Sequence, residues 1–209
     1  MTEARTDFDK LAAQWDQNPV PVRIALGVGE AIIRETSPDP TMDVLDFGCG
    51  TGLVLLRLQP LVKSVTGVDS SPAMLEKLQE KFIAQGIANG STQLVDFEQG
   101  GRISGSFDLI VSSMTLHHVS DTAEIFAQWY GLLKQNGRVC FADLDSEDGS
   151  FHADNAGVKH FGFDRDGLAQ LLTRTGFREV RHLTATTVAR EIEGKGTREF
   201  PVFLIVARK

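Results

Sequence analysis

Apolar residues recur at helical spacing in the first forty residues and predict two helices there. The first helix covers residues 8–15 and ends at the helix-breaking pair Asn18-Pro19. The second covers residues 22–34, and a proline-containing turn follows at 37–40. We therefore expect a helical segment, residues 1–40, ahead of the main body of the fold.

From residue 41 onward, short apolar runs alternate with longer helical patterns. Strands are predicted at 44–47, 64–68, 92–95, 107–112 and 138–144, and helices at 53–58, 72–85, 122–133 and 165–175. Ser71 and Asp164 are suited to cap the helices that follow them. This alternation favours a parallel sheet with helices on both faces, formed mainly by residues 41–145.

The pattern changes near the end of the chain. Two β segments, 179–189 and 200–207, flank a polar turn at 193–196 and predict a hairpin that adds an antiparallel edge. Because proline cannot donate to a sheet ladder, we expect Pro201 at the start of its strand. Residues 146–209, a loop, a helix and this hairpin, complete a single domain over residues 1–209.

Composition narrows the class of protein. The 209 residues are 42% hydrophobic and 23% charged, ordinary values for one globular domain. The net charge of −7 disfavours nucleic acid as a partner, and no apolar stretch is long enough for a membrane span. Two cysteines, Cys49 and Cys140, form no CxxC pair, and the first residues lack a signal peptide pattern. We expect a cytoplasmic protein, monomeric or homodimeric.

A glycine-rich loop, VLDFGCGTG at residues 44–52, carries the strongest chemical signal. It joins a strand to a helix, an arrangement that lets a ligand approach the backbone at a helix N-terminus. Asp46 just before the loop would repel a pyrophosphate but suits an ammonium or sulfonium group. The third glycine comes one place too early for GxGxxG, and no Gly-Lys-Ser/Thr follows. The loop thus argues against dinucleotides and nucleoside triphosphates.

Two further acids follow the next strands. Asp69 ends the second strand, where a carboxylate can accept hydrogen bonds from ribose hydroxyls, and Met74 on the following helix can pack against a purine. Asp96-Phe97 ends the third strand, where Asp96 can accept from an exocyclic amine and Phe97 can stack on its ring. Helix capping by Asp69 and a surface turn at Asp96 are the alternatives.

Four segments in this order and spacing, VLDFGCGTG, GVDSSPAMLEKL, LVDFE and FDLIVSSMTLHHV, closely resemble the class I S-adenosylmethionine-dependent methyltransferases. Within them the chain looks like the UbiE- or UbiG-like branch that acts on small molecules. The resemblance implies a Rossmann-like, doubly wound, seven-stranded α/β sheet of order 3-2-1-4-5-7-6. It also implies that Gly48 and Gly50 hold the methionine part of S-adenosylmethionine, Asp69 the ribose and Asp96 the adenine.

The full set of residues expected at the cofactor is Asp46, Gly48, Cys49, Gly50, Asp69, Ser70, Met74, Asp96, Phe97, Ser112, Trp15 and Arg23. Trp15 and Arg23 belong to the N-terminal helices, which we expect to act as a lid. Arg23 is suited to pair with the methionine carboxylate, and a solvated helix position is the alternative.

Catalytic candidates are fewer, because methyl transfer needs a base only if the acceptor must lose a proton. His117 and His118 follow the fourth strand at its carboxyl end, where open α/β sheets bind ligands. Either histidine can act as a general base. Alternatively, one of them fixes the loop by hydrogen bonding and the other only lines the pocket as a wall. Related quinone O-methyltransferases carry Glu where His117 stands and use it to hold a metal, so no metal is expected here.

A second cluster follows the fifth strand and contains acids, histidines and phenylalanines. It is either an acceptor pocket with aromatic walls or a solvated loop anchored by its phenylalanines. The members are Asp143, Asp145, Glu147, Asp148, His152, Asp154, His160, Phe151, Phe161 and Phe163.

The predicted function is methyl transfer to a small-molecule acceptor. A non-catalytic S-adenosylmethionine-binding domain is the alternative that intact cofactor motifs leave open. A nicotinamide oxidoreductase conflicts with Asp46 and with the glycine spacing.

Overall fold

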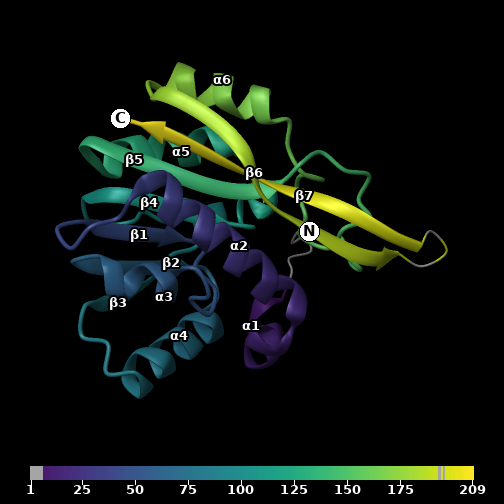
Figure 1. Ribbon diagram of the computed structural model, residues 1–209. Helices are drawn as coiled ribbons and strands as arrows, with labels where there is room; N and C mark the ends of the chain where they lie inside the picture. The colour runs from purple at the N-terminus through teal and green to yellow at the C-terminus, as the bar shows by residue number, and fades with distance from the viewer. Residues whose placement is uncertain (1–6, 193, 195) are drawn as a thin grey trace.

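The computed structural model of the protein describes residues 7–192, 194 and 196–209. Among these, seven strands form one sheet in the order β3-β2-β1-β4-β5-β7-β6 (Figure 1). The strands β1 to β5 pair in parallel, and β7 runs antiparallel to both β5 and β6. Their bounds are β1 Asp43–Phe47, β2 Ser64–Asp69, β3 Gly90–Leu94, β4 Phe107–Ser113, β5 Leu133–Leu144, β6 Arg178–Ile192 and β7 Gly196–Arg208. This confirms the predicted Rossmann-like sheet and its antiparallel hairpin strand.

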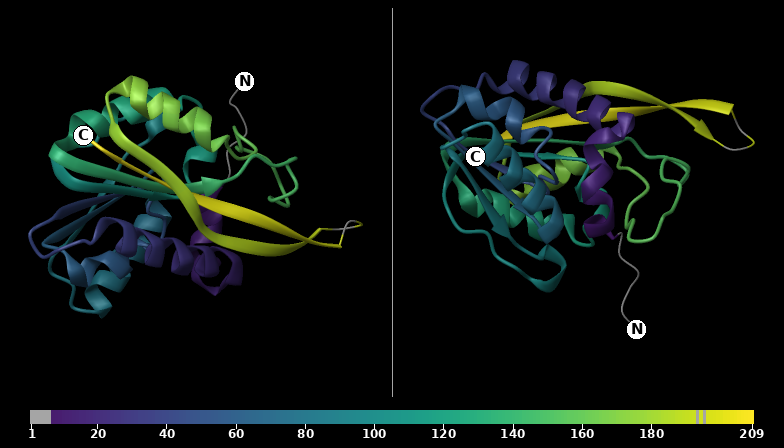
Figure 2. Two further views of the ribbon diagram at one scale, coloured as in Figure 1. Left: turned by 45° about the horizontal axis from the view of Figure 1, so that its top comes forward. Right: turned by 90° about the horizontal axis from the view of Figure 1, so that it is seen from below.

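Helices cover both faces of the sheet. They are α1 Phe8–Leu11, α2 Pro19–Thr36, α3 Leu55–Leu58, α4 Pro72–Ala84, α5 Thr122–Leu132 and α6 Arg165–Thr175, with short 3₁₀ turns η1 Ala12–Gln17, η2 Gln59–Leu61, η3 Phe97–Gln99 and η4 Leu116–His118. Successive strand residues face opposite sides. Val44 therefore joins a core cluster with α2, α3 and α4, whereas Leu45 joins one with α5 and α6. The right-hand view of Figure 2 shows α2 and α6 on opposite sides of the sheet.

The helix α2 starts earlier than expected. It begins at Pro19 rather than at residue 22, because Asn18 caps it by accepting a hydrogen bond from the backbone N–H of Val20. A proline at the first helical position costs nothing, since its missing N–H would have no partner there. The pair Asn18-Pro19 therefore ends η1 and starts α2 at once.

The hairpin of β6 and β7 is longer than predicted. Pairing of β7 with β5 stops at Val202, whereas pairing with β6 continues to Gly196 opposite Ile192. A two-stranded ribbon therefore projects beyond the sheet, as both views of Figure 2 show. Pro201 lies inside β7 and not at its start, which corrects the prediction. It is tolerated because it stands where β5 no longer pairs with β7.

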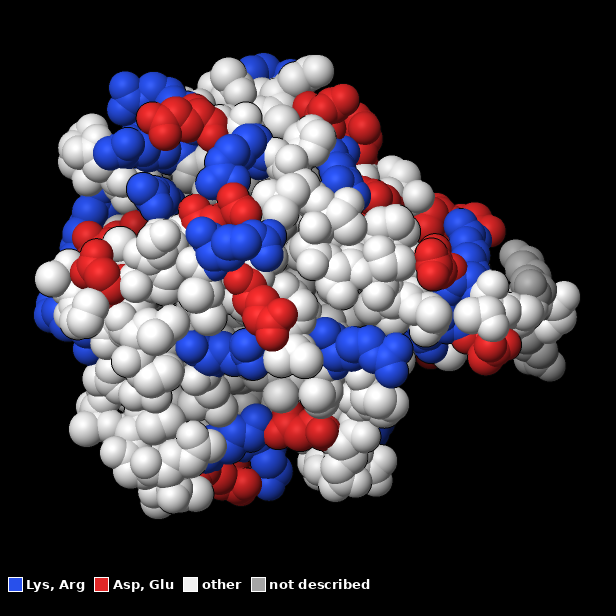
Figure 3. All heavy atoms as spheres, viewed as in Figure 1, with Lys and Arg blue, Asp and Glu red and all other residues white. Residues whose placement is uncertain are grey.

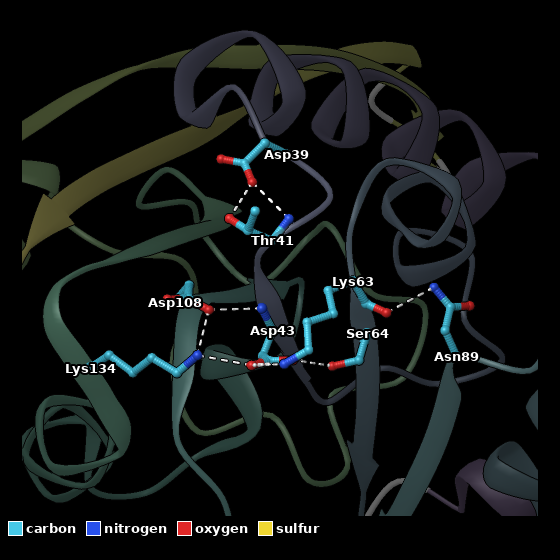
Figure 4. Close-up of polar contacts among 8 residues, drawn as sticks. All are labelled: Asp39, Thr41, Asp43, Lys63, Ser64, Asn89, Asp108 and Lys134. Carbon is cyan, nitrogen blue, oxygen red and sulfur yellow. Dashed lines mark hydrogen bonds and ion pairs between the residues drawn. The ribbon is translucent and has the colours of Figure 1, made fainter.

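Ion pairs join the amino ends of the strands (Figure 4). Asp43, the first residue of β1, accepts from Lys134 Nζ at 2.8 Å and from Ser64 Oγ at 2.7 Å. Lys134 also reaches Asp108 at 2.7 Å, and Asp108 accepts from the backbone N–H of Asp43 at 2.8 Å. These contacts bind β1, β2, β4 and β5 together at one end and leave the carboxyl ends for a ligand.

The surface does not present one sign of charge on the face that Figure 3 shows, where Lys and Arg are interspersed with Asp and Glu. Within the described ranges, no helix has the length and apolar character that a bilayer crossing requires.

Candidate active site

A cavity of about 1190 Å³ lies at the carboxyl ends of the central strands. It brings together all but two of the residues predicted at the cofactor, and both predicted catalytic histidines. Those on its lining are Trp15, Asp46, Gly48, Cys49, Gly50, Asp69, Ser70, Met74, Asp96, Phe97, His117 and His118. The two outside it are Arg23, which is exposed on α2, and Ser112, whose buried hydroxyl donates to the Phe47 carbonyl at 2.8 Å. Neither position supports contact with a ligand in this cavity.

The glycine loop lies across β2. Gly48 and Cys49 donate their backbone N–H groups to the Val68 carbonyl at 2.8 and 3.0 Å, and both Gly48 and Gly50 have positive φ. A Cβ at Gly48 would clash with the side chain of Thr115. A Cβ at Gly50 would meet only Met74 Sδ, at 3.9 Å, so the space above Gly50 is open. The loop therefore presents its backbone to the cavity at Gly50.

Asp46 is a buried carboxyl on the cavity lining. It is 2% exposed, and its Oδ2 has no hydrogen-bond partner among the described residues. Burial, and then the charge of Asp69, raises the pKa of Asp46 to about 7. A buried, unpartnered carboxylate oxygen needs a donor, and the ammonium group of S-adenosylmethionine has the required charge.

Asp69 fixes the loop and the start of α4 together. Its Oδ2 accepts from the Gly50 N–H at 2.8 Å, and its Oδ1 accepts from the Ser71 N–H at 2.9 Å. Burial raises the pKa of this carboxyl, and the two backbone N–H groups act against that effect. Each oxygen keeps a second lone pair, so the carboxylate can still accept from ribose hydroxyls.

The adenine side of the predicted site is at the end of β3. Asp96 accepts from the Glu98 N–H and from Gln99 Nε2, both at 3.1 Å, so it also forms the turn that the alternative interpretation foresaw. The Phe97 ring stacks on Phe47 with centroids 4.0 Å apart, and Phe97 also lines the cavity.

The N-terminal segment is attached to the cofactor side by two carboxylates that the sequence interpretation missed. Asp9 accepts from Ser71 Oγ at 2.5 Å and from the Ala73 N–H at 3.1 Å. Asp16 accepts from Thr51 Oγ1 at 2.5 Å and pairs with Lys81 at 2.5 Å. No local pattern signals these contacts, because the partners lie far apart in the sequence.

His117 is held by a buried carboxylate. Its Nδ1 lies 2.7 Å from Asp143 Oδ1, and its backbone N–H donates to Asp143 Oδ2 at 3.2 Å. Both residues are 1% exposed or less. With the proton on Nδ1, the ring donates to Asp143, and Nε2 is its acceptor nitrogen.

His118 is placed differently. Its Nδ1 lies 3.0 Å from the Gly157 carbonyl, and the Phe8 ring meets it edge-on with centroids 5.1 Å apart. Burial, and then the neighbouring His117, lowers the pKa of His118 to about 4. His118 is therefore a neutral, weak base near pH 7.

The cluster after β5 divides between the two interpretations. Three of its acids have structural roles: Asp145 pairs with Arg165, Asp148 pairs with Arg198, and Glu147 accepts from the N–H groups of Ser150 and Phe151. His160 bonds to the Val119 carbonyl, Phe163 is buried, and Phe161 is exposed. Phe151, His152 and Asp154, however, line the cavity, as a pocket wall would. Among the described residues, no group of three or more His, Cys, Asp or Glu could hold a metal ion.

Arg190 is a cavity residue that sequence reasoning missed. It comes from β6 where the ribbon leaves the sheet, and its guanidinium donates to the Phe151 carbonyl. The guanidinium carbon lies 5.1 Å from the centroid of the Phe151 ring. Only the long-range folding of the ribbon over residues 151–157 brings Arg190 to the cavity.

Comparison with known proteins agrees with this geometry. Residues 44–137 match the family described as "Methyltransferase domain". An uncharacterized methyltransferase of Schizosaccharomyces pombe is 37% identical over 135 residues, which cover 58% of this chain and 48% of that protein. Aklanonic acid methyltransferase of a Streptomyces species is 28% identical over 147 residues, covering 69% and 66%. The chain thus spans about half to two thirds of these relatives.

The fold is shared with solved structures. Phosphoethanolamine N-methyltransferase 2 of Haemonchus contortus, solved with S-adenosyl-L-methionine, superposes with a TM-score of 0.70 at 15% identity. The superposition covers 98% of this chain and 60% of that one.

Proposed function

We propose that the chain contains an S-adenosylmethionine-dependent methyltransferase domain, as the family match and the relatives indicate, and that the protein transfers a methyl group from S-adenosylmethionine to a small organic acceptor. The observation that carries the proposal is one continuous cavity with two different ends. The glycine loop and three carboxylates, Asp46, Asp69 and Asp96, line one end, and histidine and phenylalanine rings line the other. The first end suits the donor and the second an acceptor.

The residues at the first end of the cavity fit S-adenosylmethionine, the methyl donor. Asp46 offers a buried oxygen to the ammonium group, Asp69 accepts from the ribose hydroxyls, and open space above Gly50 admits the methionine part. When bound, S-adenosylmethionine supplies an electrophilic methyl group on a positively charged sulfur.

The protein's part in the chemistry is alignment and exclusion of water. We propose that the bound acceptor and S-adenosylmethionine displace water from the cavity lined by Trp15, Met114 and Phe151, which strengthens the electrostatic interactions inside it. Where the acceptor must lose a proton, His117 is the better placed base, because Asp143 holds its ring in one orientation. His118, with its lowered pKa, is suited to form a wall.

Two finer assignments belong to the proposal. Membership of the UbiE- or UbiG-like branch is supported by the motif resemblance alone. An organic acceptor is supported by the relative named for aklanonic acid. A cytoplasmic location and a monomeric or homodimeric state stay predictions.

The proposed methyl transfer is tested by measuring turnover with a panel of acceptors. The purified protein is incubated with S-adenosylmethionine and a panel of phenols, carboxylic acids, amines and enolisable ketones, and released S-adenosylhomocysteine is measured. Turnover above the rate without acceptor is expected for at least one class. Cofactor binding with no turnover in any class would make the domain a binding module, and no binding at all would overturn the proposal.

The two histidines are then separated by single-turnover rates of His117→Ala and His118→Ala. If His117 is the base, its loss slows transfer by roughly 10²–10⁴-fold and changes the pH profile. If a histidine only lines the acceptor pocket, its replacement by alanine changes the affinity for the acceptor more than the rate of the chemical step. Wild-type rates in both variants across pH would remove the base and leave alignment as the catalytic device.

A further inference from the structure

The acceptor end of the cavity contains an arginine that has no carboxylate partner in the described part of the chain. The hydrogen bond of Arg190 goes to the Phe151 carbonyl, and its guanidinium lies over the Phe151 ring. By contrast, Arg198 on β7 pairs with Asp148 at 2.6 Å, and Arg165 pairs with Asp145 at 2.5 Å. A carbonyl and a ring face leave the charge of Arg190 without an anion, and a guanidinium has further N–H donors in a planar fork.

His152 lies beside this guanidinium and also lacks a partner. Its Nε2 is buried with no hydrogen bond to any described residue, and its ring lies 5.0 Å from His117 and 5.9 Å from His118, centroid to centroid. Burial, then the two other histidines and Arg190, lowers the pKa of His152 to about 4. The positive charge beside His152 is that of the Arg190 guanidinium, and the neutral imidazole can donate one N–H to an anion.

Two carboxyl groups lie near this end, and both already accept hydrogen bonds within the protein. Asp143 is already engaged by the ring and the backbone N–H of His117. Asp154, also on the lining, is exposed and accepts from the Ala156 N–H at 2.9 Å.

We propose that the methyl acceptor is a largely apolar molecule with a carboxylate, held through one carboxylate oxygen by Arg190 and His152, and that the product is its methyl ester. The inference rests on the proposed methyl transfer and names its acceptor class. The apolar part of the acceptor is accommodated by Leu11, Ile24, Ala25 and Met114, which line the same cavity. Arginine suits the role because its permanent charge and its several N–H donors can hold one carboxylate oxygen while the other stays free.

The reaction balances without a proton transfer. The free carboxylate oxygen donates an electron pair to the methyl carbon, the carbon–sulfur bond breaks, and its electron pair stays on the sulfur. One negative and one positive charge disappear together, giving a neutral ester and a neutral thioether. A carboxylate arrives ionised near pH 7, so the weak basicity of His118 is no obstacle.

Matched ligand pairs test this inference. A panel of polycyclic aromatic and medium-chain aliphatic carboxylic acids, each beside its primary amide, is titrated by calorimetry into the full-length protein saturated with S-adenosylhomocysteine. The same pairs are assayed for turnover. We expect at least one acid to bind roughly tenfold or more tightly than its amide and to be converted to the methyl ester.

Three variants assign the preference. Arg190→Gln should abolish the difference between acid and amide, and Arg190→Lys should keep part of it because the charge remains. Arg198→Gln is the matched control, since it removes a paired arginine from the same ribbon, and it should leave the preference unchanged. Equal stability of the three variants toward heat, in the presence of S-adenosylhomocysteine, shows that the fold is intact.

The outcomes that would overturn the carboxylate acceptor differ from those that would overturn methyl transfer itself. Turnover confined to neutral acceptors, equal binding of acids and amides, or an acid preference that survives Arg190→Gln would each overturn the acidic acceptor and leave methyl transfer standing. Absence of binding by every acid in the panel also counts against it. Absence of S-adenosylhomocysteine binding would instead overturn the proposed function.

Discussion

At the scale of single residues, Asp46 couples ionisation to ligand binding. Its pKa in the folded protein is about 7, raised by burial and then by Asp69, whereas an unfolded aspartate ionises near pH 4. Between about pH 4 and pH 7 the folded state therefore binds more protons than the unfolded state, and stability falls as pH rises through this window. Above about pH 7 the Asp46 carboxyl is ionised in both states, and the full cost of burying its charge lowers the stability of the fold.

We predict that Asp46→Asn raises the unfolding free energy of the ligand-free protein at about pH 8 by up to about 4 kcal/mol, and changes it little below about pH 4. The same variant should bind S-adenosylhomocysteine more weakly, because a neutral amide replaces the carboxylate facing the ammonium group. Urea unfolding at both pH values, with calorimetry, checks both parts. An equal gain at both pH values would show that ionisation of Asp46 is not the cause.

Asp69 is the residue on which the ribose assignment depends. We predict that Asp69→Ala weakens S-adenosylhomocysteine binding by about 1.5–3 kcal/mol, the usual worth of hydrogen bonds to a charged group. Part of this loss comes from the Gly50 N–H, which Asp69 also holds. Asp121→Ala, which removes the cap of α5 away from the cavity, is the control for lost helix capping. Calorimetry showing wild-type affinity for Asp69→Ala would refute the assignment.

At the scale of elements, the N-terminal helices are predicted to act as a lid over the cofactor. The helix α2 packs Ile24, Val28 and Ile32 into the core, so we propose that lid motion is confined to the segment before Asn18. Two carboxylates, Asp9 and Asp16, attach that segment to α4 and to the glycine loop.

We predict that S-adenosylhomocysteine slows hydrogen exchange in residues 8–17 and that the double variant Asp9→Asn, Asp16→Asn removes most of this protection. The reason is that the two carboxylates are the polar links between the lid and the cofactor side. Exchange followed by mass spectrometry, with α6 as an internal reference away from the lid, measures the effect. Equal exchange with and without ligand would identify the segment as a fixed appendage.

The ion pairs at the amino ends of the strands make a second prediction at this scale. The hydrogen bond from Lys134, followed by that from Ser64, holds the pKa of Asp43 well below its usual range. A lowered carboxyl pKa stabilises the fold above about pH 4, and this contribution is lost as pH falls below that value. We predict that Asp43→Asn lowers the unfolding free energy by about 1–3 kcal/mol near pH 7, and that this loss shrinks progressively as pH falls below about 4 toward the lowered pKa of Asp43. Cofactor affinity, measured alongside, should not change.

Local pattern was enough to predict the strands of the parallel sheet, because most of them contain a short apolar run bounded by turn residues. The exception is β3, a polar edge strand, whose predicted bounds of 92–95 are shifted from Gly90–Leu94. The glycine loop and Asp69 were equally accessible, since they are consecutive with their strands. The contacts of Asp9, Asp16 and Arg190 were not, because each joins segments that meet only in the folded chain. The buried bond between His117 and Asp143 needs two neighbouring strand ends in register, which spacing alone does not reveal.

At the scale of the whole molecule, the ligand should stabilise both faces of the sheet together. The strands carry alternate residues into two core clusters, so unfolding of one face exposes the other. We predict that S-adenosylhomocysteine at about 100 times its Kd raises the unfolding free energy by about 2.7 kcal/mol and Tm by roughly 5–10 °C in one transition. Differential scanning calorimetry tests this, with NADH as the negative control, and two separate transitions would contradict it.

The projecting ribbon of β6 and β7 lies outside the sheet that stabilises the fold, and it carries Arg190, the residue proposed to hold the acceptor. Its tip lies beyond the last pairing with β5, so residues can be inserted there in opposed pairs without shifting the register of the sheet below. Substitutions in opposed pairs at the level of Arg190 and Arg198, which contact Phe151 and Asp148, would change the side chains beside that loop while the glycine loop stays untouched. Under the proposed function, we expect exchange of this hairpin between homologous proteins to alter acceptor choice and to leave the methyl donor unchanged.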